Sequence, residues 1–324
     1  MGAESMARAA PSWREVSVPV GWGSLRGKTC LLGEAKGGAS LRVLALHGWL
    51  DNANSFDALV PLLPAGLEVL ALDLAGHGLS DHLPAGARYD AMTQLVHLRE
   101  AMRRLGWTDF VILAHSWGAL VANYFAALYP QDVRALVVLD YLRPFHQEER
   151  LATWRAENRL MRREERGEGR ARRVYSEAEA LSRLVEARKG GDSKQLPNVD
   201  EAAARILLPR AARRVDGGLA WRHDEKARTR YTMLYGSDNW MYVISHVTCP
   251  VMLVRADDGI CQQPDDLYAP VLAAYRRSAR VFRYHRVAGA HHVHLTHPER
   301  LAPSVTHFLT QDVAAAKDKA ASKL

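Results

Sequence analysis

The chain has few of the features that mark secreted or membrane proteins. It has only three cysteines in 324 residues, Cys30, Cys249 and Cys261, and none forms a Cys-x-x-Cys pair. We therefore expect free thiols in a reducing compartment rather than a disulfide framework. No apolar run approaches the roughly 18 residues that span a bilayer, and the first residues lack the apolar segment of a secretory signal. Neither a transmembrane segment nor secretion is expected.

Signals for nucleotide and nucleic-acid binding are also missing. The loop from Asp73 to Ser80 contains two glycines, but their spacing does not match a phosphate-binding fingerprint. We expect Asp73 and His77 to brace that loop rather than to react. No base-reading motif accompanies the positive charge, so nucleic acid is not an expected partner. The sequence shows no internal repeat, and we expect no cofactor.

Positive charge is concentrated in one part of the chain. The net charge is +7, and residues 141–230 contain 22 Lys and Arg against 15 Asp and Glu, so the rest is formally neutral. Arginine binds phosphate through paired hydrogen bonds, so this segment could attract an anionic substrate such as an acyl-coenzyme A. A solvated helix with Glu–Arg pairs remains the alternative. The arginines concerned are Arg162, Arg163, Arg166, Arg170, Arg172 and Arg173.

Apolar runs alternate with helix-length segments over most of the chain, which predicts a mostly parallel α/β sheet of eight strands with helices on both faces. The first two runs alternate in polarity and predict an antiparallel hairpin at the sheet edge. Expected strands are residues 15–20, 26–32, 41–46, 67–72, 110–113, 135–139, 251–254 and 281–286. Expected helices are residues 89–105, 119–129, 265–277 and 298–310.

The alternation stops between residues 141 and 245, where no convincing strand is found and Arg, Glu and Ala dominate. A segment of this length is too long for an ordinary loop. We predict a helical cap inserted after the sixth strand. Residues 1–140 and 246–312 then form the core, and residues 313–324 form a flexible tail.

Ser116 follows the apolar run of residues 110–113 and has small residues, Ala114 and Gly118, as second neighbours. A helix-like segment follows it. This pattern is typical of a nucleophile elbow, a strained strand-to-helix turn that exposes a serine hydroxyl. Ala114 stands where the usual pattern has glycine, but it is still small. We predict that Ser116 is a nucleophile.

A serine nucleophile needs a base, an orienting acid and oxyanion donors, and in this architecture the acid and the base follow the serine in the chain. His291 is the expected base because it is the first histidine after the turn at Gly289. Asp258 is the first choice for the acid, after the strand of residues 251–254. The adjacent Asp257 stays open, as does Asp140 at the end of the sixth strand.

The oxyanion donors are expected to be the backbone amides of Trp117, directly after the serine, and of Trp49, in the loop after an earlier strand. His292, His294 and His297 crowd the expected base. No carboxylate or cysteine set completes a metal site with them at suitable spacing, so we expect packing or hydrogen-bonding roles and no metal.

These residues together resemble the α/β-hydrolase fold over residues 15–312. The runs HGWLDNANSFD (residues 47–57), GHGLS (76–80) and GAHHVH (289–294) are similar, more narrowly, to the serine hydrolase-like proteins. The resemblance implies a peroxisomal or vesicular hydrolase of undefined substrate. A serine at the elbow favours transfer of an acyl group to water, because epoxide hydrolases and dehalogenases of this fold place aspartate there.

The expected function is therefore cleavage of a carboxylic ester or thioester of a small acyl substrate. A hydrolase-fold protein that binds a ligand without turnover, or a cofactor-free peroxidase using the same triad, remains an alternative. Ser322, Lys323 and Leu324 form the peroxisomal import address SKL. The import receptor is thus an expected partner and the peroxisome the expected location.

Overall fold

The structure is a computed structural model, which describes residues 11–34, 40–142, 173–188, 198–228, 237–261 and 265–316, with isolated positions between 155 and 166. Within these residues, no helix is both long and apolar enough to cross a membrane. The expected address at Ser322, Lys323 and Leu324 lies outside the described residues.

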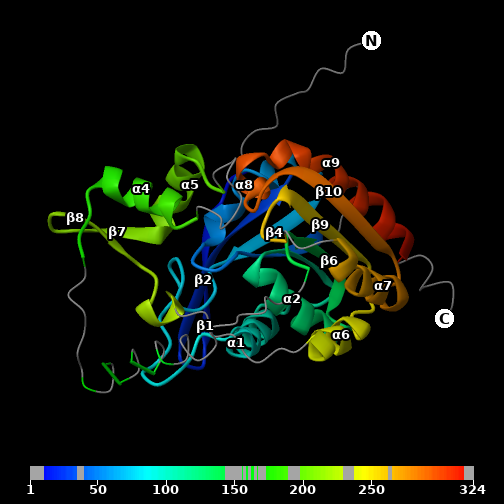
Figure 1. Ribbon diagram of the computed structural model, residues 1–324, viewed down its shortest axis with the longest axis horizontal. Helices are drawn as coiled ribbons and strands as arrows, with labels where there is room; N and C mark the ends of the chain where they lie inside the picture. The colour runs from blue at the N-terminus through cyan, green and yellow to red at the C-terminus, as the bar shows by residue number, and fades with distance from the viewer. Residues whose placement is uncertain are drawn as a thin grey trace, which may run out of the picture.

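One eight-stranded sheet forms the centre of the molecule (Figure 1), in the order β1-β2-β4-β3-β5-β6-β9-β10. β1 and β2 form an antiparallel hairpin at one edge, and the pairs from β4 through β10 are parallel. The sheet class and the edge hairpin predicted from the sequence are confirmed. Its strands are β1 (Arg14–Val20), β2 (Gly23–Leu32), β3 (Leu41–Leu46), β4 (Leu67–Leu72), β5 (Phe110–His115), β6 (Val133–Leu139), β9 (Val251–Asp258) and β10 (Phe282–Ala290).

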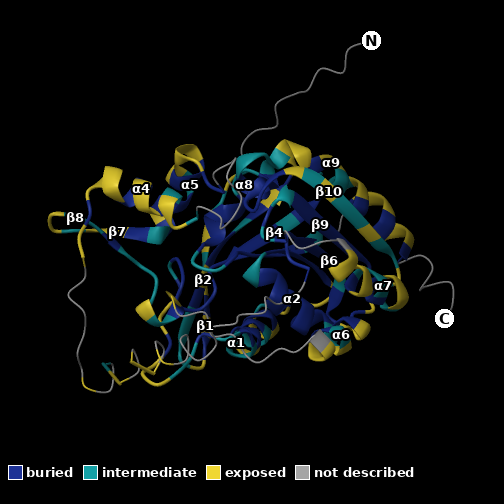
Figure 2. Ribbon diagram, in the orientation of Figure 1, coloured by how far each residue is buried: buried dark blue, intermediate teal, exposed yellow. Residues whose placement is uncertain are grey.

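Successive side chains of the central strands enter different cores, because strand residues alternate between the two faces of a sheet. In β5, Ile112 packs in one apolar cluster, and its neighbours Val111 and Leu113 pack in the other. Helices cover both faces, with their buried sides toward the sheet (Figure 2). The first face carries α1 (Ala91–Arg104), α2 (Trp117–Leu128), α6 (Ser237–Ser245) and α7 (Ala269–Ser278). The second carries η1 (Ala53–Phe56), η2 (Val60–Leu62), α8 (Val293–Thr296), α9 (Ala302–His307) and η6 (Phe308–Asp312). The short turn η5 (Pro298–Arg300) connects α8 to α9.

Between β6 and β9, residues 173–188 and 198–228 lie beside the sheet as a separate small unit (Figure 1). It contains α4 (Glu177–Glu186), α5 (Glu201–Ala211) and η3 (Glu225–Arg228). It also contains a two-stranded hairpin, β7 (Ala212–Val215) with β8 (Gly218–Trp221), which the sequence prediction missed. Each of these strands has only four residues, too few for a visible alternation of polarity. We call residues 173–228 the cap.

Two boundaries differ from the predicted ones. α6, assigned to the insertion, packs through the buried Trp240 and Ile244 in the same cluster as α2 and α7. The Trp240 indole also donates to the Leu142 carbonyl, 2.9 Å away. The predicted tail begins too early, because residues 313–316 are helical and Val313 is buried. Apolar contacts therefore extend both boundaries of the core.

A buried arginine, Arg210, helps to fix the cap on the core. Arg210 of α5 donates twice to Asp73 Oδ2, at 2.7 and 3.0 Å. Asp73 also accepts the amides of Ala53 and Leu79. Asp73 therefore braces this loop, as predicted, and also holds α5. Because a buried carboxylate needs such partners, removal of Arg210 should be costly.

Candidate active site

Ser116 occupies a strained turn between β5 and α2. Its φ is 52° and its ψ is −120°, a region that residues with a side chain rarely adopt. A methyl group added to Gly118 would lie 2.5 Å from the carbonyl oxygens of Leu46 and His47, so that position needs glycine. Ala114 is fully buried and its methyl group is accommodated. The elbow therefore accommodates alanine at position 114 but requires glycine at position 118.

His291 lies between Ser116 and a carboxylate. Its Nδ1 is 2.6 Å from Asp140 Oδ2, and its Nε2 is 2.8 Å from Ser116 Oγ. A carboxylate only accepts hydrogen bonds, so Nδ1 must carry the proton and Nε2 the lone pair. Ser116 then donates its hydroxyl proton toward Nε2. This is the arrangement in which an imidazole can take the proton of a nucleophile.

The structure corrects the first choice of acid. Asp258 ends β9 and makes no hydrogen bond to His291, whose two ring nitrogens already have Asp140 and Ser116 as partners. Asp257 forms an ion pair with Arg286 at 2.9 Å. Asp140 follows β6, the strand between β5 and β9, which brings its carboxylate nearer the elbow. The alternative Asp140 therefore replaces Asp258.

Backbone amides at the end of β9 and just after it hold the Asp140 carboxylate in place. The Ala256 amide donates to Oδ1 at 3.0 Å, and the Ile260 amide donates to Oδ2 at 2.9 Å. A methyl group on Gly259 would overlap Oδ2, so this glycine allows the loop to approach. The sequence predicted that this segment supplies the acid itself, through Asp258 or Asp257. Its backbone instead positions the carboxylate of Asp140.

The loop after β3 is fixed by His47. The Nδ1 atom of His47 donates to the Gly48 carbonyl at 2.7 Å, and its Nε2 accepts the Leu74 amide at 3.0 Å. The indole of Trp49 donates to the Ala227 carbonyl of the cap at 2.7 Å. Trp117 is the first residue of α2, and its ring lies 5.9 Å from that of His77. Gly48 of this loop lies against Ser116, since a methyl group added to it would be 3.2 Å from Ser116 Cβ, while the oxyanion role of the two amides stays a prediction.

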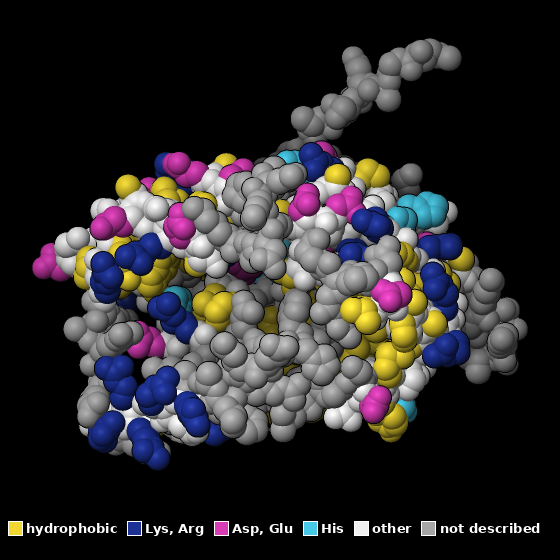
Figure 3. Space-filling model, viewed as in Figure 1, with side chains coloured by type: hydrophobic (Ala, Val, Ile, Leu, Met, Phe, Trp, Pro, Cys, Tyr) yellow, Lys and Arg dark blue, Asp and Glu magenta, His cyan; other side chains and the backbone are white. Residues whose placement is uncertain are grey.

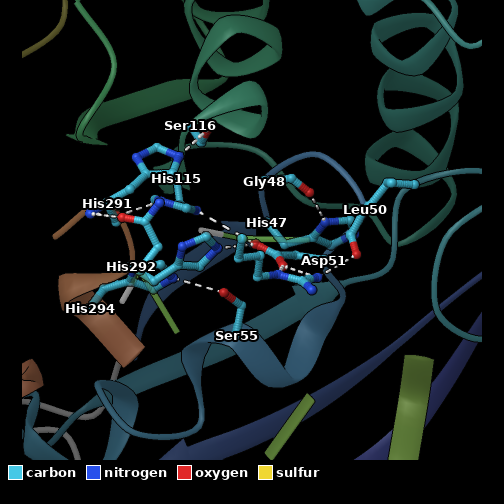
Figure 4. Close-up of polar contacts among 12 residues, drawn as sticks. His47, Gly48, Leu50, Asp51, Ser55, His115, Ser116, His291, His292 and His294 are labelled. Atoms are coloured by element: carbon cyan, nitrogen blue, oxygen red, sulfur yellow. Dashed lines mark hydrogen bonds and ion pairs between the residues drawn. The ribbon is translucent and has the colours of Figure 1, made fainter. Parts of the chain in front are cut away.

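A second carboxylate lies among histidines beside this site (Figure 4). Asp51 accepts from Arg188 of the cap at 2.7 Å and contacts His292 Nε2 at 3.0 Å. Burial would raise the pKa of Asp51, but the charge of Arg188 and the contact with His292 outweigh it and hold that pKa well below its usual range. Burial lowers the pKa of His115 well below its usual range, so this ring is neutral.

The neighbouring histidines have the predicted structural roles in part. His294 Nε2 is 2.8 Å from Ser55 Oγ in the interior, and burial lowers the pKa of His294. His297 contacts Thr296 and is half-buried. His292, however, faces a carboxylate in a group with His115. Sequence reasoning overlooked Asp51 and Arg188, and no local motif joins them, since they are brought together only by the docking of the cap.

Comparisons with known proteins agree with this fold. A family model described as alpha/beta hydrolase fold matches residues 42–298. A serine hydrolase-like protein of Danio rerio is 35% identical over 94% of this chain and 90% of its own length. A probable serine hydrolase of Drosophila melanogaster is 31% identical, over 93% of this chain and 88% of its own. The crystal structure of a hypothetical protein from Pseudomonas aeruginosa PAO1 matches with a TM-score of 0.73 and 28% identity, over 93% of this chain and 99% of that one.

Proposed function

Because the chain belongs to the α/β hydrolase fold family, and within it to the serine hydrolase-like proteins, we propose that this hydrolase cleaves a carboxylic ester or thioester through an acyl-enzyme. The observation that supports the proposal most is the hydrogen-bonded series Ser116–His291–Asp140, with separations of 2.8 and 2.6 Å. A serine hydroxyl reacts at neutral pH only when a base of this kind takes its proton.

In the first step, Ser116 Oγ bonds to the substrate carbonyl carbon while its proton passes to His291 Nε2. Asp140 stabilises the imidazolium, as the acid of such a triad does. The carbonyl oxygen gains the negative charge, and we assign its stabilisation to the amides of Trp49 and Trp117. The N-terminus of α2, a helix of 12 residues, adds its dipole there.

Collapse of that intermediate breaks the bond to the alcohol or thiol, and His291 returns the proton to the leaving group. Water then enters, gives a proton to Nε2 and attacks the acyl carbon. The carboxylic acid leaves, and Ser116 regains its proton. The same two side chains therefore act twice, in opposite directions.

Labelling with a fluorophosphonate probe tests the nucleophile. We expect one label per chain, at Ser116, and none in the Ser116→Ala protein, which should also lose turnover of p-nitrophenyl esters. An unlabelled but folded parent chain would contradict the proposal and favour the alternative of a binding protein without turnover. The Ser80→Ala protein is a matched control, because Ser80 is buried and donates to the Asp73 carbonyl.

The positive charge of the inserted segment supports an anionic acyl substrate. Arg162, Arg166 and Arg173 are exposed, whereas Arg170 and Arg172 lie outside the described residues. Lys and Arg side chains gather at the lower left of the face in Figure 3. If this charge attracts substrate, turnover of an acyl-coenzyme A should fall as salt rises, because surface charges are screened. Turnover of an uncharged ester should change little.

We also propose import into peroxisomes through Ser322, Lys323 and Leu324. A fluorescent protein fused before residue 1 leaves this address accessible. The fusion should give a peroxisomal pattern, and deletion of the last three residues should give a diffuse one. Equal distribution of the two fusions would overturn this proposal while leaving the hydrolase chemistry untouched.

A further inference from the structure

Three ligand-type side chains converge on one point beside Ser116. Asp51, His115 and His292 come from separate segments of the chain, and one oxygen or nitrogen of each lies within 4.8 Å of the others. All three are buried. Figure 4 shows Asp51 lying between the histidine rings and Leu50. No local motif in the sequence indicates this set, because dozens of residues separate its members.

The tautomer of His115 is fixed by its surroundings. Its Nε2 lies 2.9 Å from the carbonyl oxygen of His291, and a carbonyl only accepts, so Nε2 carries the proton. The lone pair is then on Nδ1, which has no hydrogen-bond partner among the described residues. This atom faces Asp51 Oδ2 across 3.9 Å. Two electron-rich atoms face each other there, and a cation between them would satisfy both.

Asp51 is held so that one oxygen remains available to the histidines. Arg188 binds Oδ1 at 2.7 and 2.9 Å, while Oδ2 lies 3.0 Å from His292 Nε2. Two atoms that each lie about 2.1 Å from a tetrahedral ion are about 3.4 Å apart. The separations of 3.0 and 3.9 Å from Oδ2 bracket this value, so small side-chain movements would suffice.

Gly48 keeps the space beside these atoms open. A methyl group there would lie 2.9 Å from His115 Nδ1 and 3.2 Å from Asp51 Oδ2. The same methyl group would lie 3.2 Å from Ser116 Cβ. The space therefore borders both the proposed ligands and the proposed nucleophile.

We propose that Asp51 Oδ2, His115 Nδ1 and His292 Nε2 form a binding site for a divalent transition-metal ion such as Zn²⁺. Two imidazoles and one carboxylate suit this class of ion, whereas Mg²⁺ and Ca²⁺ require mainly oxygen ligands. On binding, the proton of His292 moves from Nε2 to Nδ1, and coordination replaces the contact with Asp51. The charge of Arg188 opposes the ion and limits its affinity.

Binding at this site has a consequence for the reaction, and this part rests on the proposed function. His115 precedes Ser116 and His292 follows His291 in the chain. Coordination by His115 and His292 would therefore shift both Ser116 and His291. Zn²⁺ should therefore lower ester turnover, and chelation should restore it.

Titration of the chelator-treated, full-length protein with Co²⁺ tests the site without any need for activity, because tetrahedral Co²⁺ absorbs visible light strongly. We expect one ion per chain, displaced by Zn²⁺. The His292→Gln protein should bind at least ten times more weakly, and so should His115→Gln. The His297→Gln protein, altered on the same segment, should bind as the parent does, and so should Ser116→Ala. Circular dichroism establishes that each variant is folded.

Three outcomes would overturn the proposal. The first is a parent chain that does not bind Co²⁺ at millimolar concentration. The second is undiminished binding by folded His292→Gln and His115→Gln proteins. The third is a loss of binding in the His291→Gln protein alone, which would place the ion on the catalytic pair instead. Failure of the hydrolase proposal would remove the inhibition but leave the Co²⁺ titration unchanged.

Discussion

Replacement of Asp140 by asparagine separates the two candidate acids and can be followed quantitatively. Oδ2 accepts from both His291 Nδ1 and the Ile260 amide, and Oδ1 accepts from the Ala256 amide. If the new amide nitrogen takes the Oδ2 position, its N–H groups face two other donors, His291 Nδ1 and the Ile260 amide, and both hydrogen bonds are lost. If it takes the Oδ1 position, it faces the Ala256 amide, which is also a donor, and that hydrogen bond is lost. In both cases the negative charge that stabilises the imidazolium is lost.

The expected cost is a fall in kcat of roughly 10⁴-fold, as for an asparagine in the acid position of a serine triad. This corresponds to about 5.4 kcal/mol of transition-state stabilisation, at 1.36 kcal/mol for each factor of ten. The Asp258→Asn protein should stay within about threefold of the parent, since Asp258 makes no hydrogen bond to His291 and its position at the end of β9 is half-buried.

Steady-state hydrolysis of p-nitrophenyl butyrate measures both effects, with Ser116→Ala as the baseline and thermal unfolding as the check on folding. A folded Asp140→Asn protein with a tenth or more of the parent kcat would refute the assignment. So would an Asp258→Asn protein that loses as much activity as Asp140→Asn.

Three further perturbations follow from the same contacts. The Gly259→Ala protein should remain folded but lose at least 100-fold in kcat, as ester turnover would show, because the methyl group displaces the Asp140 carboxylate; activity near that of the parent would contradict this. The Arg210→Met protein should lose roughly 3–5 kcal/mol of unfolding free energy in urea, because Asp73 stays buried without its cation, whereas loss of the exposed partner alone, in Glu15→Gln, should cost under about 1 kcal/mol. Burial lowers the pKa of His77 from 6.5 to about 3, so the unfolded chain binds a proton below pH 6.5 that the folded chain does not, and stability should fall as pH drops from 6.5 toward 3. In the His77→Gln protein this dependence should weaken by up to about 1.4 kcal/mol per pH unit, and an unchanged slope in urea unfolding at pH 5 and 7 would contradict the assignment.

Sequence patterns predict the sheet well where a strand is buried on both faces. The expected strands at residues 41–46 and 67–72 have the bounds of β3 and β4, because each range is apolar except for its second residue, Arg42 or Glu68, and its last four residues are all buried. The exposed hairpin β7–β8 was missed, since two strands of four residues in a charged segment give no such signal. The sequence prediction placed α6 in the insertion instead of the core. Its composition does not indicate that Trp240 packs against α2 and α7.

The candidate site shows the same division between local and long-range information. Ser116 and His291 each lie in a distinctive local motif, and the structure brings them together. The acid has no such motif. Asp140 and Asp258 both stand near strand ends, and only the placement of β6 between β5 and β9 decides between them. Asp51 could not be found at all from one sequence, because its partner Arg188 lies in the cap, 137 positions away.

The position of Asp51 links two parts of the molecule that the sequence separates. Arg188 donates both to Asp51 Oδ1 and to the Leu50 carbonyl, so one cap side chain holds the loop that supplies the proposed oxyanion donor. The φ of Leu50 is 56°, a strained conformation for leucine, which persists only when neighbouring contacts enforce it. The cap therefore holds a loop of the core in place. By neutralising Asp51 and fixing the strained turn beside Trp49, a seated cap completes the site, and a chain whose cap is displaced should retain His291 and Ser116 in place but lose the geometry of the oxyanion loop.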